Sequence, residues 1–326
     1  MDSRLSLALA ARQSDLDSNH ESAFRLFNGF SEGDSNLSLD VYGRTLLINN
    51  YADDPTQLQR LIDETIDYLR SNFNWLRAGI VKQRNGTTHE DKRGKLLFGN
   101  SPETKIKEHG VWYALDLTMN RDASFYLDTS NLRKWLIENM AGKSILNTFA
   151  YTGSFGVAAL AGGATRVVQV DRNRRFLDLA KQSYALNRFE VNPKDFVAQD
   201  FFPAVSRFKH TKQLFDCVIL DPPFFSSTSR GRVDQVNESA RLINKVRPLV
   251  NDGGKLIAIN NALFVSGQEF MHTLEKLCED GYMKIQALIP VPQSFVGYNI
   301  VNKPITDPAP FNHSTKIAIL KIKRKL

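Results

Sequence analysis

The sequence predicts an α/β protein built on a doubly wound, mostly parallel sheet, with a smaller N-terminal α/β domain. Three observations predict this fold. Residues 145–171 have the pattern of a strand, a turn with a glycine, a helix of small residues and a second strand that ends in an acid. Farther on, apolar runs alternate with helical segments, which is typical of a parallel sheet covered on both faces. Residues 214–220 are almost continuously apolar, as expected for a strand buried on both faces.

The length of the chain predicts a division into three parts. At 326 residues it exceeds the usual size of one domain. Residues 1–21 are expected to form a short helix and a linker, and residues 22–120 a small α/β domain with possible RNA contacts. Residues 121–326 are expected to form the large domain, with the boundary somewhere between 115 and 130.

The small domain is predicted from alternating strands and one amphipathic helix. Its expected elements are strands 37–42 and 45–48, a helix from Asp54-Pro55 to about Asn72, a strand at 78–82 and a strand at 111–116. The polar stretch 82–107 is rich in Lys and Arg. It is expected to be a loop, either solvated or facing RNA.

The large domain is predicted as a regular alternation of helices and strands. The expected helices are 130–140, 154–161, 173–187, 232–250 and 267–279, and the expected strands are 144–147, 166–170, 195–199, 214–220, 255–259, 285–290 and 316–322. In such sheets ligands bind at the carboxyl ends of the strands. Gly153, Asp171, Asp200 and Asp221 are all expected there.

Composition limits the class of protein. The chain has two cysteines, Cys217 and Cys278, and its six histidines show no metal-ligand spacing, so neither a disulfide framework nor a metal site is expected. No apolar run is long enough for a membrane span, and the N-terminus lacks the pattern of a secretory signal. We therefore expect a cytoplasmic protein without a membrane partner. Its net charge of +7 favours a polyanion such as RNA, although a plain basic enzyme is compatible with it.

The turn after strand 144–147 predicts a nucleoside site. A dinucleotide fingerprint would have glycines where this turn has Phe149, Tyr151 and Gly153, which leaves too few bare amides for a pyrophosphate. A nucleoside that carries an amino acid needs one close backbone approach, and S-adenosylmethionine fits this description. Asp171, at the tip of the next strand, is suited to bind two ribose hydroxyls. The alternatives are an ordinary packed α/β unit and, for Asp171, a helix N-cap.

Two further strand ends carry candidate residues. Asp200 can accept a hydrogen bond from the adenine amino group, or it can cap the helix that follows. Asp221-Pro222-Pro223-Phe224 forms a rigid turn in which Phe224 offers a flat face to a nucleobase, so we treat these four residues as the catalytic candidates. The alternative is a turn with an aromatic core plug.

Asn260 and Asn261 follow the next strand along the chain. They can read a base edge, or they can simply end the strand, because Asn is common in turns. Together with Phe224 they are the candidate substrate-binding residues. Cys217 lies inside a buried strand and is expected to be inert.

These residues, in this order, resemble the bacterial class I S-adenosylmethionine-dependent methyltransferases of large-subunit ribosomal RNA, the group with the 5-methylcytosine and 7-methylguanine enzymes. The resemblance covers about residues 22–326. It rests on the segments 24–29, 39–43, 108–110, 125–128 and 147–155 and on the strand-end acids. It implies a Rossmann-like sheet and S-adenosylmethionine as the cofactor. With the turn residues included, the candidate cofactor-binding residues are Tyr126, Asp128, Asn147, Phe149, Tyr151, Gly153, Asp171, Asp200 and Asp221.

The chain departs from this group in three respects. The 5-methylcytosine enzymes attack the base with a cysteine after the fourth or fifth strand, and this chain has Asp221-Pro-Pro-Phe and Asn260-Asn261 there. The first 21 residues leave no room for the PUA-type domain of many relatives. Thr129-Ser130 stands where relatives often carry a polar-Arg pair.

We therefore expect a methyltransferase that modifies a base of RNA, with ribosomal RNA as the expected substrate. The expected acceptor is a nitrogen, and no covalent attack by a cysteine is needed. Methylation of a protein or small molecule is one alternative, and a catalytically silent RNA-binding relative is another. A nicotinamide oxidoreductase is a more distant alternative, because of the turn chemistry.

Overall fold

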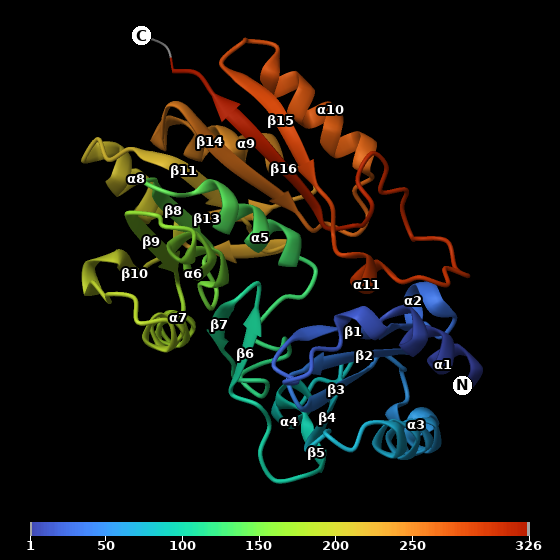
Figure 1. Cartoon of the computed structure of the whole chain (residues 1–326). Helices are drawn as coiled ribbons and strands as arrows, with labels where there is room; N and C mark the ends of the chain where they lie inside the picture. Colours follow the sequence, from blue (N-terminus) through green and yellow to red (C-terminus); the bar gives the residue numbers. More distant parts are fainter. Residues whose placement is uncertain (1, 325–326) are drawn as a thin grey trace. The chain divides into compact units, whose positions relative to one another are not determined.

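The computed structural model describes residues 2–324 and resolves two compact units (Figure 1). The first unit runs to Asp128 and also includes Pro292–Pro304. The second unit comprises Thr129–Val291 and the chain from Ile305 onward. The chain thus enters the first unit a second time, whereas the sequence predicted one boundary near residues 115–130.

The first unit contains a five-stranded sheet in the order β1-β2-β3-β4-β5 and a separate β6–β7 pair. Only β3 and β4 run parallel, and helix α3 connects them. The strands are β1 (Ala23–Asn28), β2 (Leu37–Tyr42), β3 (Thr45–Asn50), β4 (Ala78–Gln83), β5 (Lys95–Phe98), β6 (Lys105–Glu108) and β7 (Val111–Ala114). The helices are α1 (Asp2–Ala11), α2 (Gly29–Glu32), α3 (Gln59–Asn72), α4 (His89–Arg93) and α11 (Gln293–Val296), with 3-10 turns at Gln13–Asp15 and Pro55–Leu58.

The stretch 82–107 is more ordered than the predicted loop. It contains α4, β5 and β6, and Thr88 begins α4 with a capping box that it forms with Asp91. The capping box satisfies backbone N–H groups at the start of the helix, which lets so short a polar helix form.

Buried charges tie the re-entrant segment to the rest of the first unit. Arg12 is fully buried and pairs with Glu32 at 3.0 Å. The guanidinium also donates to the carbonyl of Ser294, at 3.1 Å from Nε and 2.8 Å from Nη2. Asn28, at the end of β1, donates to the carbonyls of Phe295 and Val296, both at 3.0 Å. The segment with α11 is therefore part of the polar interior of this unit.

The second unit contains a seven-stranded sheet in the order β10-β9-β8-β11-β14-β16-β15. Strands β10, β9, β8, β11 and β14 are parallel, and β16 pairs antiparallel with both of its neighbours. The strands are β8 (Ser144–Thr148), β9 (Arg166–Asp171), β10 (Phe196–Ala198), β11 (Phe215–Leu220), β14 (Val250–Asn260), β15 (Met283–Ile289) and β16 (Lys316–Ile322). The helices are α5 (Ser130–Asn139), α6 (Ser154–Ala161), α7 (Arg174–Leu186), α8 (Phe201–His210), α9 (Ser239–Val246) and α10 (Gly267–Cys278).

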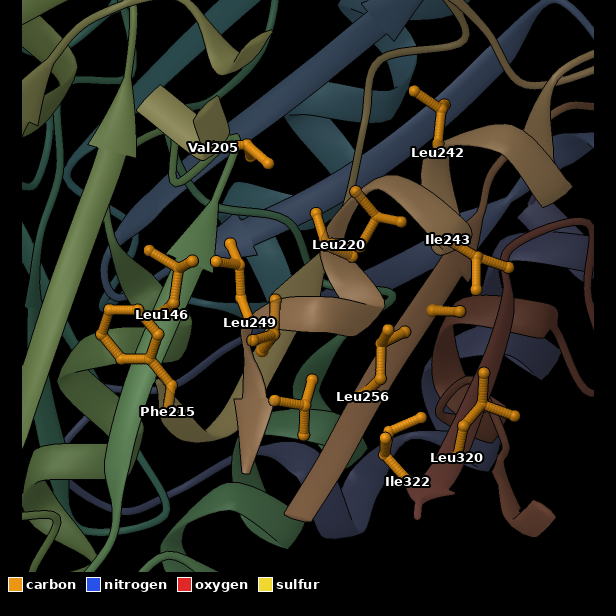
Figure 2. Packing of buried hydrophobic residues seen from close by; sticks show 14 of the residues in the cluster. Leu146, Val205, Phe215, Leu220, Leu242, Ile243, Leu249, Leu256, Leu320 and Ile322 are labelled. Carbon is orange, nitrogen blue, oxygen red and sulfur yellow. The ribbon is translucent and has the colours of Figure 1, made fainter. Parts of the chain in front are cut away.

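Alternate residues of the central strands pack on opposite faces of this sheet. Leu220 and Leu256 belong to a core with α8, α9 and α10, which Figure 2 shows through Val205, Leu242 and Ile243. Their chain neighbours Ile219 and Ile257 belong to a second core with α5 and α6. Because helices cover both faces, the predicted doubly wound α/β sheet is confirmed.

The predicted helix 232–250 is wrong in its first half. A hairpin of β12 (Phe225–Thr228) and β13 (Gly231–Asp234) precedes the shorter helix α9. Asp234 accepts hydrogen bonds from the backbone N–H groups of Val236 and Asn237, at 3.0 and 3.1 Å. This side-chain turn ends the strand and competes with a continuous helix.

Between residues 2 and 324, no helix combines the length and the apolar character needed to cross a membrane. Nor do three or more His, Cys, Asp or Glu side chains in that range gather as a group that would hold a metal ion.

Candidate active site

The strand register brings the carboxyl ends of the central strands to one level. Thr148 of β8 pairs with Val170 of β9 and with Leu220 of β11. The next residue along each strand is therefore Phe149, Asp171 or Asp221. Since parallel strands end at the same edge, Phe149 lies between Asp171 and Asp221 at this edge of the sheet.

The turn that follows β8 has an unusual backbone. Phe149, Tyr151 and Gly153 all have positive φ, at 54°, 50° and 75°. For Phe and Tyr this conformation costs about 1–2 kcal/mol each relative to a right-handed one. Such strained residues persist only where neighbouring contacts hold them, and they are frequent at functional sites.

Several contacts hold this turn. The N–H of Ala150 donates to the Val170 carbonyl at 2.8 Å. The Phe149 ring stacks on Phe201, with ring centres 4.6 Å apart, and the Tyr151 ring meets Phe176 edge to face at 4.6 Å. The two aromatic residues thus have packing partners on α8 and α7 that compensate for their backbone strain.

Gly153 is required for packing inside the unit. A Cβ on Gly153 would lie 2.6 Å from the Cβ of Ala180 and 2.9 Å from Nε2 of Gln169. The missing side chain therefore makes room for α7 and for Gln169 inside the unit. That Gly153 also lets a ligand approach the backbone stays a prediction.

Asp171 combines a structural task with unused hydrogen-bonding capacity. Its carboxylate accepts from the N–H of Tyr151 at 2.9 Å and from the N–H of Asn173 at 2.8 Å. A carboxylate has about four acceptor positions, so it can also take two hydroxyl donors. Burial raises the pKa of Asp171 above its usual value, and these two hydrogen bonds only partly oppose that rise. Asn173, and not Asp171, is the N-cap of α7.

A buried amide pair supports the turn from inside the sheet. Asn147 donates through Nδ2 to Oε1 of Gln169 at 2.8 Å, and Gln169 donates through Nε2 to the Gly153 carbonyl at 3.1 Å. Oδ1 of Asn147 is buried and has no hydrogen-bond partner among the described residues. Leaving such an acceptor unpaired costs about 1–3 kcal/mol, so a donor on a ligand would stabilise it.

Asp200 is the N-cap of α8, as one of its two predicted interpretations required. Oδ1 accepts from the N–H of Phe202 at 3.1 Å, and Oδ2 accepts from the hydroxyl of Thr228 at 3.1 Å. The second bond fixes the β12–β13 hairpin to the start of α8. A carboxylate with these two donors retains acceptor positions, so a role toward adenine stays a prediction.

The turn Asp221-Pro222-Pro223-Phe224 is held by Gln235, which the sequence prediction missed. This side chain is 1% exposed. Its Nε2 donates to the Pro222 carbonyl, and its Oε1 accepts from the N–H of Asn261 at 2.7 Å. Its backbone N–H donates to the Phe224 carbonyl at 3.1 Å. Gln235 therefore joins the turns after β11 and β14, while residue Phe224 stays 46% exposed.

Asn260 and Asn261 have different surroundings. Asn260 is 1% exposed, and its Nδ2 donates to the Gln235 carbonyl at 3.2 Å and to the Ser239 hydroxyl at 3.0 Å. Its Oδ1 accepts from the N–H of Ala262 at 3.0 Å. These bonds use the side chain inside the fold and argue against base reading by Asn260. Asn261 is exposed.

Tyr126 and Asp128 belong to the first unit, so the geometry of the strand ends does not include them. The Tyr126 ring is exposed, and its hydroxyl donates to Oδ2 of Asp122 at 3.0 Å. A cofactor role for Tyr126 and Asp128 stays a prediction.

Neither cysteine is suited to nucleophilic attack. Cys217 is fully buried in β11, and burial raises its pKa to about 12. Burial also raises the pKa of Cys278, at the end of α10. Since the thiolate is the nucleophile, both residues are almost entirely in the unreactive thiol form at neutral pH.

The residues at this edge fit S-adenosylmethionine. Asp171 has acceptor capacity for two ribose hydroxyls, Asn147 has an unpaired buried oxygen, and exposed Phe224 offers an aromatic face. A seven-stranded sheet with this order and one antiparallel strand, with its polar groups at the carboxyl ends, defines the class of nucleoside-binding doubly wound proteins.

Comparison with known proteins gives the family. The family model for S-adenosylmethionine-dependent methyltransferases matches residues 29–282, and the chain belongs to that family. The predicted class of enzyme, the predicted cofactor and the predicted resemblance to bacterial large-subunit ribosomal RNA methyltransferases are confirmed at the level of the family.

Two curated relatives carry ribosomal RNA in their names. The Bacillus subtilis protein named "Putative ribosomal RNA large subunit methyltransferase YwbD" is 30% identical over 80% of this chain and 66% of its own length. Ribosomal RNA large subunit methyltransferase I of Shigella flexneri is 28% identical over 81% of this chain and 67% of its own length. The chain thus spans about two thirds of the length of these relatives.

A solved structure shares the fold. It is described as a putative S-adenosylmethionine-dependent methyltransferase from Streptococcus mutans, with a TM-score of 0.84 and 23% identity. The match covers 98% of this chain and 80% of that chain.

Proposed function

We propose that this protein transfers the methyl group of S-adenosylmethionine to a ring or exocyclic nitrogen of a base in large-subunit ribosomal RNA. The observation that carries the proposal is the row formed by Phe149, Asp171 and Asp221, with the exposed ring of Phe224 beside it. The names of both relatives and the net charge of +7 support RNA as the substrate. An enzyme with this substrate works in the cytoplasm, where ribosomes are.

Residues of the strand ends bind and orient the reactants. Asp171 accepts hydrogen bonds from the ribose hydroxyls, and Asp200 lies one strand farther to receive the adenine amino group. The face of Phe224 stacks on a base taken out of its RNA stack, and the carboxylate of Asp221 accepts a hydrogen bond from that base. The fixed Pro-Pro turn means that little freedom is lost when the base docks.

The chemistry of the site favours nitrogen as the acceptor. S-adenosylmethionine, when bound, supplies a methyl group that its sulfonium has already activated. A nitrogen with a free lone pair needs alignment and no covalent help, whereas carbon methylation of a pyrimidine requires a thiolate. Cys217 is buried, and burial raises the pKa of both cysteines, so neither supplies a thiolate readily.

The test is nucleoside mapping of large-subunit ribosomal RNA from cells with and without the gene. We expect one methylated base to be absent from the deletion strain and to be restored in vitro by the purified protein with S-adenosylmethionine. A methylated base that carries the group on carbon, or unchanged RNA in the deletion strain, would contradict the proposal.

Two variants make the test specific to the strand ends. Asp221→Ala should lower the methyl-transfer rate at least about 100-fold, because a misplaced base loses the geometry of attack. Asp178→Asn, a half-exposed carboxylate on α7, is the matched control and should leave the rate unchanged. If both variants lost the same fraction of the methyl-transfer rate, Asp221 would have no specific role in the reaction.

A further inference from the structure

A basic groove lies on the flank of the second unit, outside the row of strand ends. It has a volume of about 500 Å³, and its lining residues come from α8, the β12–β13 hairpin and α9. The residues that line it are Phe202, Pro203, Ser206, Arg230, Gly231, Arg241, Leu242 and Lys245. Three of these side chains are cations, and none is an acid.

Two of the three cations have no ion pair with a carboxylate among the described residues. They are Arg230, which is exposed at the hairpin turn, and Lys245, which is partly buried on α9. Arg241 donates to Glu238 and to the Arg232 carbonyl, both at 2.8 Å. Gathered cations repel each other, and burial together with the charge of Lys245 lowers the pKa of the nearby Lys209. An anion in the groove would relieve this repulsion.

The floor of the groove points to a phosphate rather than a base. The Phe202 ring lies under the Arg241 guanidinium at 5.6 Å, and a Cβ on Gly231 would be 2.4 Å from that ring. Arg241 and the backbone of Gly231 therefore already lie against this ring, which leaves little room for a stacked base. The groove offers the Ser206 hydroxyl and charged donors instead, and these are the groups that bind phosphodiesters.

The groove is connected to the strand ends by the hairpin. Arg230 follows Phe224 by six residues, which span at most about 20 Å in an extended strand. The bond between Thr228 and Asp200 keeps the hairpin fixed to α8. A strand whose base stacks on Phe224 can therefore place a phosphate, a few nucleotides away, in the groove.

We propose that this groove binds a backbone phosphate of the substrate RNA, with Arg230 and Lys245 as its principal cations. The inference rests on the proposed function, since it assumes an RNA substrate. Phosphate contacts fix the register of an RNA without reading its sequence. The distance between the groove and Phe224 then determines which base of the RNA reaches the strand ends.

The test compares two double variants of the full chain that lose the same charge. Arg230→Gln with Lys245→Gln removes two of the three groove cations, and Lys134→Gln with Lys276→Gln removes two exposed cations from α5 and α10. Binding of protein-free large-subunit ribosomal RNA is measured by fluorescence anisotropy at several salt concentrations. Calorimetry with S-adenosylmethionine reports whether the cofactor site is intact.

We expect the groove variant to bind RNA more weakly and with a smaller salt dependence. Each phosphate contact with a single strand contributes about 0.7 to the slope of log K against log salt, so losing two contacts reduces the affinity change between about 50 and about 200 mM salt by about 7-fold. The α5/α10 variant should keep the wild-type slope, and all proteins should bind S-adenosylmethionine equally.

Other outcomes separate the groove from the proposed function. If wild type methylates RNA but both double variants have the same slope, the groove is not a phosphate site and the proposed function stands. If wild type neither binds nor methylates RNA, both proposals fall. If AMP binds as tightly as RNA and loses affinity only in the groove variant, the groove is a mononucleotide site, which overturns the RNA assignment.

Discussion

The two ends of the parallel strands in the second unit carry the same kind of acid in different surroundings. At the amino end, Asp216 of β11 accepts from the N–H and hydroxyl of Ser144 at 2.8 and 2.9 Å, and from Nδ2 of Asn251 at 3.0 Å. Asp195, near the start of β10, pairs with Arg166 at 2.7 Å. At the carboxyl end, the carboxylate of Asp171 accepts from the backbone N–H groups of Tyr151 and Asn173.

The pKa shifts of these acids have opposite directions. Burial disfavours the charged form of Asp216, but the hydrogen bonds from Ser144 and Asn251 together outweigh it and lower its pKa. At Asp171, burial outweighs the hydrogen bonds and raises the pKa. Side chains of the protein thus stabilise the charged form of the acid at the amino end, whereas burial outweighs the two hydrogen bonds and the charge of Arg172 at the carboxyl end.

The largest effect is expected from removing the carboxylate of Asp171. Asp171→Ala should weaken binding of S-adenosylmethionine by at least about 100-fold, because two hydrogen bonds to a charged group contribute about 1.5–3 kcal/mol each. Calorimetry measures the dissociation constant. A change of less than threefold in this dissociation constant would mean that Asp171 does not bind the cofactor.

The counterpart at the amino end should affect folding and not binding. Asp216→Ala should lower the free energy of unfolding at neutral pH by about 1–2 kcal/mol, because Ser144 and Asn251 lose their acceptor. Its affinity for S-adenosylmethionine should match that of wild type. If Asp216→Ala kept its free energy of unfolding in urea titration but no longer bound S-adenosylmethionine, the assignment of a purely structural role to Asp216 would be wrong.

The contribution of Asp216 to the free energy of unfolding should depend on pH, and its pKa shift gives the sign. A lowered folded-state pKa means that Asp216 contributes stability above its ordinary value of 3.8 and loses it as the pH falls through the folded pKa. The stability difference between wild type and Asp216→Ala should therefore shrink when urea titrations are repeated below pH 3.8. A constant difference would show that charge is not involved.

A smaller loss of rate is expected from the residue that joins two turns at the carboxyl end. Gln235→Glu keeps the acceptor for Asn261 but replaces the donor to the Pro222 carbonyl by an acceptor. We expect kcat to fall about 10-fold, as one hydrogen bond of about 1.4 kcal/mol is lost from the catalytic turn. The dissociation constant for the cofactor is the control and should not change. Gln235→Ala should be at least as impaired.

The smallest effect is the pH dependence of cofactor binding near Asp171. Because its folded pKa is raised above 3.8, its carboxylate becomes protonated as the pH falls while ordinary acids remain charged. Affinity for S-adenosylmethionine should decrease on acidification, starting above pH 3.8. The Asp171→Ala variant should lack this decrease, and a wild-type affinity that is flat down to pH 4 would contradict the prediction.

The sequence predicted most of the sheet because its signals are local. The β8–α6–β9 unit follows from apolar periodicity, a glycine turn and a terminal acid, and the structure forms these elements at the predicted positions. The part that failed depends on distant contacts. Gln235 has no local signal, since its partners at Pro222 and Asn261 meet it only in the folded chain. Gln169 did have a signal, as a polar residue inside the apolar strand β9.

Pattern also misled where a side chain ended an element early. Leu242, Ile243 and Val246 fit a helix that extends backward to residue 232, but the Asp234 turn stops it. Gly153 shows the converse. Its position was predicted correctly, and the reason for the glycine, the contact with Ala180, required the packed helix α7.

The return of Pro292–Pro304 to the first unit determines how this protein can be dissected. A fragment that stops at Asp128 lacks α11, so Asn28 would lose the acceptors at Phe295 and Val296, and Arg12 would lose the carbonyl of Ser294. Cutting the chain at one point therefore cannot give two fragments that each contain a complete unit. A fragment with the complete first unit requires a designed linker that joins residue 128 to residues 292–304.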